Sequence, residues 1–268
     1  MPERIEVGAL TLAYEERQPP GGSEEAVLFV HGLGGSLHSW WAQLAACEAA
    51  GRRAIAYDQR GAGQSAKPPG PYSVGLWVDD LERLIDGLGL RRVALVGQSV
   101  GCMIAEQAAV RLGARASGLA LIGGGLRWRQ GSKPVFEERI RLAGAGRMDE
   151  IAAGVAETGL SERCRTENPA LCGLFRAMIA GNDPACYAEW AAATAVAEMI
   201  EPERVGCPTL VACGELDPVA PPAFAEAIAA ALPDARTRVI QGAAHWCQLE
   251  APEAVNRALL EFLDEIAT

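Results

Sequence analysis

The stretch VALVGQSVG, residues 93–101, decides the fold class of this chain. A short apolar run of strand type leads into GQSVG (97–101), and a helix-compatible segment follows to Leu112. G-x-S-x-G between a strand and a helix is typical of a nucleophile elbow, whose sharp turn raises the serine above the carboxyl edge of a sheet. A side chain at position 97 or 101 would collide with neighbouring elements, so glycine fits there. We therefore predict that Ser99 is a nucleophile in a strained backbone conformation at a helix N-terminus.

Strand-type and helix-type segments alternate on both sides of this turn. After a hairpin at 4–15, strands are expected at 26–30, 54–57, 93–96 and 119–122. The helices expected between them are 38–50, 74–88 and 100–112. Later in the chain the expected elements are a strand at 208–213, a helix at 222–232, a strand at 238–240 and a helix at 251–266. Such alternation predicts an α/β fold with a mostly parallel sheet covered by helices on both faces.

The alternation stops between residue 126 and about residue 200. This segment is Ala-rich and helix-compatible, and it is divided by breakers at Pro134, Gly144-Ala145-Gly146, Asn168-Pro169 and Asp183-Pro184. We predict a core formed by residues 1–125 and 201–268, with residues 126–200 inserted as a helical cap.

The composition of the chain argues against several classes of partner. The 268 residues are 50% hydrophobic, which is enough for one large core. The net charge of −10 argues against a nucleic-acid partner. The first 18 residues contain no apolar run, no stretch is long enough to cross a bilayer, and the eight cysteines form no C-x-x-C pair. We expect a cytoplasmic protein with reduced thiols and no membrane partner, and the sequence leaves a homo-oligomer open.

The base that activates Ser99 can be chosen from only three histidines, His31, His38 and His245. In a fold with this elbow, the nucleophile, the acid and the histidine follow one another in that order along the chain. Only His245 lies after Ser99, in a loop of small residues that follows an expected strand. We therefore predict His245 as the base and a structural role for His31.

Two carboxylates compete for the acid, Glu215 and Asp217, because both follow the expected strand 208–213. The strand before it ends in Gly123-Gly124-Gly125 and offers no acid. Pro218 restricts Asp217 to an extended backbone, and its side chain has the smaller rotamer freedom to lose. We predict Asp217 as the acid, and surface or backbone hydrogen bonds for Glu215.

The oxyanion of a tetrahedral intermediate needs preorganised N–H donors. One donor is expected from the backbone of Val100, and the other from the loop after strand 26–30, with Leu33 preferred to Gly34. The candidate pocket residues are Gly34, Trp40, Trp128, Trp190 and Trp246. Of the pair Trp40 and Trp41, one is expected in the pocket and the other in the core.

Several segments together resemble the α/β-hydrolase superfamily: HGLGGSLHSW (31–40), YDQRGAGQS (57–65), VGQSVG (96–101), GELDPVAPP (214–222) and GAAHWCQLEAPEAVNRALLEFL (242–263). Residues 58–90 are similar to the branch that contains 3-oxoadipate enol-lactonases and related small-ester esterases. The resemblance implies eight core strands, a helical cap and no cofactor. Cys102 stands where many relatives have a second glycine, and we expect it to be a small buried residue.

These features predict a serine hydrolase that cleaves a small ester, lactone or thioester through an acyl-enzyme, without a metal. Two alternatives stay open. One is a cofactor-free C–C bond hydrolase or perhydrolase that uses the same three residues, and the other is a ligand sensor with slow turnover. A serine nucleophile weighs against haloalkane dehalogenation, for which this superfamily uses an aspartate.

Overall fold

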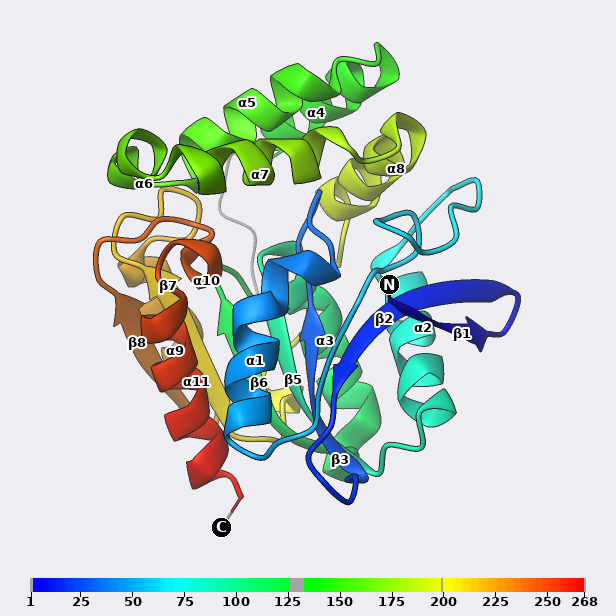
Figure 1. Cartoon of the computed structure of the whole chain (residues 1–268), viewed down its shortest axis with the longest axis vertical. Helices are drawn as coiled ribbons and strands as arrows, with labels where there is room; N and C mark the ends of the chain where they lie inside the picture. Colours follow the sequence, from blue (N-terminus) through cyan, green and yellow to red (C-terminus); the bar gives the residue numbers. More distant parts are fainter. Residues whose placement is uncertain (1, 126–132, 199, 268) are drawn as a thin grey trace.

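The computed structural model describes residues 2–125, 133–198 and 200–267. Its centre is an eight-stranded sheet with the order β1-β2-β4-β3-β5-β6-β7-β8 (Figure 1). The strands are β1 (Glu3–Val7), β2 (Leu10–Arg17), β3 (Glu25–Val30), β4 (Ala54–Tyr57), β5 (Arg92–Gln98), β6 (Ala116–Ile122), β7 (Thr209–Gly214) and β8 (Ala235–Ile240). β2 pairs antiparallel with β1 and β4, and all the other pairs are parallel. The predicted α/β-hydrolase sheet is confirmed.

Helices cover both faces of the sheet, because the central strands are apolar throughout and must be buried on each side. One face carries α1 (Trp41–Ala49) and α11 (Pro252–Glu265), whose apolar residues share one core cluster with Phe29 and Val96. The second cluster contains the apolar faces of α2 (Val74–Gly87), α3 (Val100–Leu112) and α9 (Pro222–Ala231). Short 3-10 helices at Leu37–Trp40, Gly113–Arg115 and Pro202–Arg204 complete the connections.

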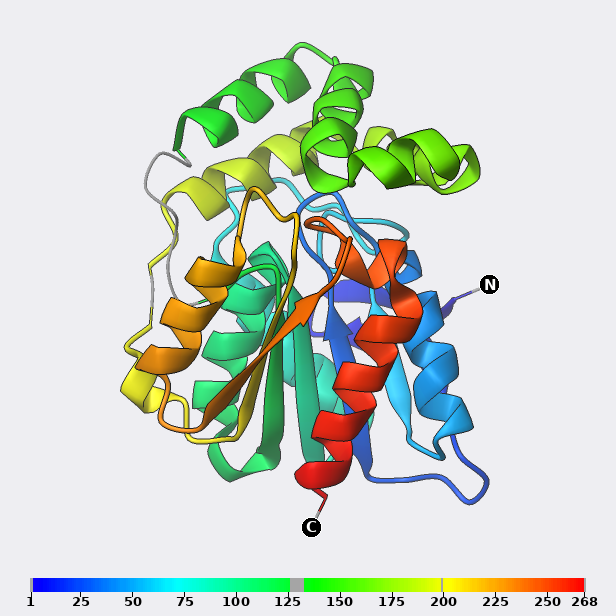
Figure 2. The same cartoon turned by 90° about the vertical axis from the view of Figure 1, so that its left-hand side faces the viewer.

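Five α-helices stand between β6 and β7 in the described part of the chain. They lie over one end of the sheet (Figures 1 and 2). They are α4 (Lys133–Gly144), α5 (Met148–Gly159), α6 (Glu162–Glu167), α7 (Pro169–Ala180) and α8 (Pro184–Ala195). The expected breakers coincide with their ends. Asn168 and Asp183 each accept a hydrogen bond from the first turn of the helix that follows, and a proline occupies its first position. We call α4–α8 the cap helices.

The strands β6 and β8 each begin three residues before the expected strand, and two further differences concern short helices. The helix expected from His38 is a 3-10 turn over Leu37–Trp40 followed by α1. A one-turn helix, α10 (Cys247–Glu250), precedes α11 and was not expected, because four residues are too few to show a periodic pattern. All eight cysteines are free, and Cys102 is fully buried as expected. Within the described residues, no helix combines the length and apolar character needed to cross a membrane.

Candidate active site

Ser99 occupies the turn between β5 and α3. Its φ of 52° makes it the only non-glycine residue with a positive φ among those described. A Cβ at position 97 would lie 2.6 Å from the carbonyl oxygen of Gly101, and a Cβ at position 101 would overlap the carbonyl oxygen of Val30. The turn is therefore as tight as predicted. It leaves the half-buried Ser99 at the N-terminus of α3, where the helix dipole favours negative charge.

Asp217 and His245 form a buried pair at the ends of β7 and β8. Nδ1 of His245 lies 2.9 Å from Oδ2 of Asp217, and Oδ1 of Asp217 accepts hydrogen bonds from the backbone of Val219 and Ala220 at 2.7 and 2.9 Å. Burial acts to raise the pKa of Asp217, but the His245 interaction and these N–H groups outweigh it and hold the pKa below its usual value. The ionised carboxylate accepts a hydrogen bond from Nδ1–H, which leaves the Nε2 lone pair of His245 available as a base.

Ser99 and this pair converge on one dipeptide, Gly123-Gly124, at the end of β6. A Cβ on Gly123 would lie 3.1 Å from Nδ1 of His245 and 3.3 Å from Oδ2 of Asp217. A Cβ on Gly124 would lie 3.1 Å from Cα of Ser99 and 2.8 Å from its carbonyl oxygen. The three predicted catalytic residues are therefore brought together around the carboxyl end of β6. In the sequence these glycines show that no acid follows this strand, and a glycine run at a strand end also signals close packing.

The loop after β3 passes directly beside Ser99. A Cβ on Gly32 would lie 3.1 Å from Cβ of Ser99. Leu33 and Gly34 follow in this loop, which we call the oxyanion loop (31–36). The amide of Val100 is the first of α3, so it has no carbonyl partner within the helix. Both predicted oxyanion donors thus belong to segments that adjoin the nucleophile.

The other two histidines have different roles. Nε2 of His31 accepts a hydrogen bond from the Gln59 backbone, and Nδ1 lies 2.9 Å from the Gly32 carbonyl oxygen. Burial lowers the pKa of His31 and outweighs the opposite effect of the nearby Asp58 carboxylate. His38 is exposed and contacts Trp41 edge-on. His31 therefore supports the loop, in agreement with its predicted structural role.

The candidate pocket residues do not share one environment. Gly34 lies under the cap helices, because a Cβ there would meet Ile179 at 2.9 Å and Tyr187 at 3.1 Å. Trp190 and Trp246 are buried where the cap helices meet the core. Trp190 Nε1 donates to the Arg60 carbonyl oxygen, and the Trp246 ring packs edge-on against Phe175 at 5.0 Å. Trp128 lies outside the described residues.

Trp40 requires a correction. Its side chain is fully buried in the core cluster that α1 and α11 form with the sheet. Its ring centroid lies 5.0 Å from that of Phe29. Trp40 therefore packs in the core, and its predicted place in the pocket is wrong. Trp41 is 55% exposed and lines an apolar groove of about 550 Å³ with Leu174 and Met178 of α7. Burial of the first tryptophan follows from its position on the sheet-facing side of the 3-10 turn.

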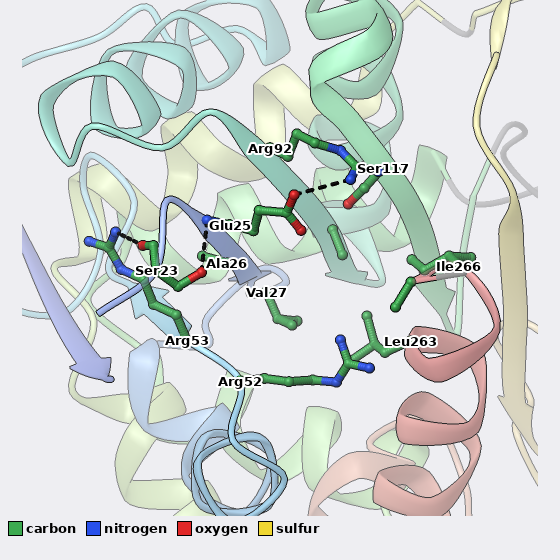
Figure 3. Close-up of a pocket in the computed structure, with 12 residues that line it drawn as sticks. Ser23, Glu25, Ala26, Val27, Arg52, Arg53, Arg92, Ser117, Leu263 and Ile266 are labelled. Carbon is green, nitrogen blue, oxygen red and sulfur yellow. Dashed lines mark hydrogen bonds and ion pairs between the residues drawn. The ribbon is translucent and has the colours of Figure 1, made fainter. Parts of the chain in front are cut away.

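A separate cavity of about 250 Å³ opens at the amino ends of β3 and β5 (Figure 3). Ser99 follows the carboxyl end of β5, so this cavity lies at the opposite end of the sheet. Each of its three arginines is already paired, Arg52 with Asp264, Arg53 with Glu16 and Arg92 with Glu25. We assign no function to this cavity. Among the residues that the structure describes, no cluster of three His, Cys, Asp or Glu side chains could hold a metal ion.

Comparison with known proteins agrees with this geometry. Residues 27–258 match the model of the alpha/beta hydrolase family. The chain belongs to this family. It is 26% identical to the "Putative carbamate hydrolase RutD" of Escherichia coli O81 (strain ED1a), over 91% of this chain and 93% of the relative.

Two of the solved structures that resemble this chain match it over almost the whole length of both chains. The enol-lactonase from Burkholderia xenovorans LB400 has a TM-score of 0.92 and 26% identity, and the alignment covers 98% of this chain and 100% of the other. A thermophilic esterase from Thermogutta terrifontis has a TM-score of 0.90 and 29% identity, with complete coverage of both chains. This alpha/beta hydrolase is therefore similar both to a lactonase and to an esterase.

Proposed function

We propose that this hydrolase cleaves a small ester, lactone or thioester through an acyl-enzyme on Ser99. The observation that carries the proposal is the convergence of Ser99, His245 and Asp217 on Gly123-Gly124, with the His245–Asp217 pair buried at 2.9 Å. A serine hydroxyl needs an adjacent base to become a nucleophile, and the base needs a partner that fixes its tautomer.

In the proposed reaction, Oγ of Ser99 attacks the substrate carbonyl carbon while Nε2 of His245 takes the hydroxyl proton. The carbonyl oxygen becomes an oxyanion, which the backbone N–H groups of Val100 and Leu33 stabilise. Collapse expels the alcohol or thiol, which receives the proton from His245. Water then attacks the acyl-enzyme by the same route, which releases the acid and restores Ser99. Asp217 stabilises the His245 cation at both stages.

The names of the relatives support a range of carbonyl substrates. A lactonase, an esterase and a carbamate hydrolase would all act on an acyl carbon bonded to a leaving oxygen or nitrogen. The cap helices favour a small acyl group, because Ile179 and Tyr187 stand directly over Gly34. We therefore expect esters with two to four acyl carbons to be hydrolysed faster than a twelve-carbon ester, and a preference for the longer ester would contradict this proposal.

Active-site labelling tests the mechanism. A fluorophosphonate probe should modify Ser99 and no other serine, as read by mass spectrometry of the digested protein. Ser99→Ala should lose the label and several orders of magnitude in kcat on a p-nitrophenyl ester, with its melting temperature retained. Intact Ser99 with label on another serine, or wild-type turnover by Ser99→Ala, would overturn the proposal. Multiple turnovers by the wild type, instead of one burst, would separate an enzyme from a slow ligand sensor.

A further inference from the structure

The backbone around His245 is held on both sides. The Ala244 N–H donates to Oε1 of Glu250 at 2.9 Å, and the Trp246 N–H donates to the Gly159 carbonyl oxygen at 3.0 Å. Gly159 ends α5, so one of these two bonds comes directly from a cap helix. The fit there is close, because a Cβ on Gly159 would lie 2.9 Å from the Trp246 ring.

Glu250 makes a second bond to the same part of the cap. Its Oε2 accepts a hydrogen bond from the Ser161 N–H at 3.0 Å, at the residue that caps α6. One carboxylate therefore joins the residue before His245 to the junction between α5 and α6. Two N–H donors face its two oxygens, and only a group with two acceptors can satisfy both. An amide of the same shape would place its own N–H₂ against one of the donors.

We propose that Glu250 is a positioning residue that couples the cap helices to His245. The inference rests on the proposed function, in which His245 moves the proton of Ser99. On this account the cap does more than cover the substrate, because residues 159–161 and Glu250 set the position of the loop that carries the base. Disturbing the bridge should slow proton transfer and lower kcat, while substrate binding, which does not involve Glu250, should keep its KM.

Glu250→Gln is the main test, and Glu253→Gln is its matched control because Glu253 is exposed and only three residues away. Glu250→Gln should lower kcat between about 10- and 100-fold with KM unchanged, whereas Glu253→Gln should match the wild type. The proton resonance of the His245 Nδ1–H, which is bonded to Asp217, gives a readout without substrate. It should shift or broaden in Glu250→Gln alone.

Ser161 allows a rescue experiment. Its φ of −63° suits proline, and Leu160 before it is extended at φ −112° and ψ 143°, so Ser161→Pro removes the N–H with little backbone strain. Ser161→Ala keeps the N–H and removes only the Oγ cap of Cys164, so it controls for the lost cap. In the Glu250→Gln background, Ser161→Pro should recover part of the lost kcat, because the amide no longer opposes a donor. Ser161→Ala should recover none.

The outcomes separate this proposal from the proposed function. A Glu250→Gln variant with wild-type kcat and an unchanged His245 resonance would overturn the positioning role and leave the hydrolase standing. A wild-type protein that neither labels at Ser99 nor turns over esters would overturn the hydrolase. In that case the His245 resonance of the Glu250 and Ser161 variants still decides whether the bridge positions the ring.

Discussion

Glu215 and Asp217 lie two residues apart in one turn, yet their carboxylates have separate partners. Asp217 binds the His245 ring through one oxygen and two backbone N–H groups through the other. Glu215 accepts a hydrogen bond from the Gly242 N–H at 2.9 Å, so it supports the loop after β8 from the outside. The backbone hydrogen bond expected for Glu215 is present, and Asp217 is the carboxylate in contact with the candidate base.

Asp217→Asn should cost on the order of 10⁴ in kcat, because an amide keeps the shape but favours the wrong tautomer of His245. Glu215→Gln should cost far less, because its oxygen can still accept the Gly242 N–H. The measurement is kcat of both variants on one p-nitrophenyl ester, with melting temperatures to establish that both fold. A crippled Glu215→Gln beside a near wild-type Asp217→Asn would mean that the acid is misassigned.

The lowered pKa of Asp217 also predicts a pH dependence of stability. A carboxyl that is more acidic when folded contributes stability above its unfolded pKa of about 3.9, and loses it as the pH falls through that value and then through the folded pKa. In urea unfolding, the difference in free energy of unfolding between the wild type and Asp217→Asn should therefore narrow as the pH falls below about 4. If this difference in free energy stayed constant with pH, folding would not lower the pKa of Asp217.

Glycine is required in the elbow between β5 and α3, but it is not required inside the cap helix α5. At Gly97 a Cβ would lie 2.6 Å from the backbone oxygen of Gly101, and backbone atoms there cannot move aside. At Gly154, inside α5, no atom lies within 4 Å of such a Cβ. The elbow therefore needs glycine for space, and the helix does not.

We expect Gly97→Ala to lower the free energy of unfolding by about 1 to 3 kcal/mol through overpacking. Gly154→Ala should instead raise it by about 0.5 to 1 kcal/mol, because alanine loses less conformational entropy in a helix. Urea denaturation of the two variants beside the wild type measures both changes. Equal effects of the two substitutions would contradict the geometry of the elbow.

Over the whole molecule, two of the contacts that the cap helices make with the core reach loops of the candidate active site. One contact is the bridge to His245. At the other, Nδ2 of Asn182, between α7 and α8, lies 3.0 Å from the carbonyl oxygen of Gly34 in the oxyanion loop. The same Nδ2 also bonds the carbonyl oxygens of Met178 and Ile179 at the end of α7. The cap therefore meets both the loop that carries the candidate base and the loop expected to bind the oxyanion.

Asn182→Ala should lower kcat about 10-fold, because a displaced oxyanion loop aims its N–H donor less well. Asn168→Ala is the matched control. It removes the same side chain from the N-terminus of α7, where Asn168 caps Leu171, and should cost about 1 kcal/mol of stability without changing kcat. The check is kcat and melting temperature for both variants, and equal kcat values would show that Asn182 serves only the cap.

The sequence by itself determined the order of the elements and the elbow at Ser99, and it singled out His245 as the candidate base. Each depends on local chemistry: apolar runs of strand length, glycines where no side chain fits, and the position of His245 after the nucleophile. Helix starts such as Pro169 and Pro184 were predictable for the same reason, because capping and the restricted φ of proline act within one turn.

Only the tertiary structure decided which side chains meet across the chain. It placed Trp40 in the core and Trp41 at a groove, although the two are neighbours in sequence. It also brought Glu250 to Ser161, 89 residues away, and packed Gly123-Gly124 against the candidate catalytic residues. Such contacts depend on how elements pack, and neither hydrophobic periodicity nor a local motif contains that information, because both describe a segment and not its neighbours in space.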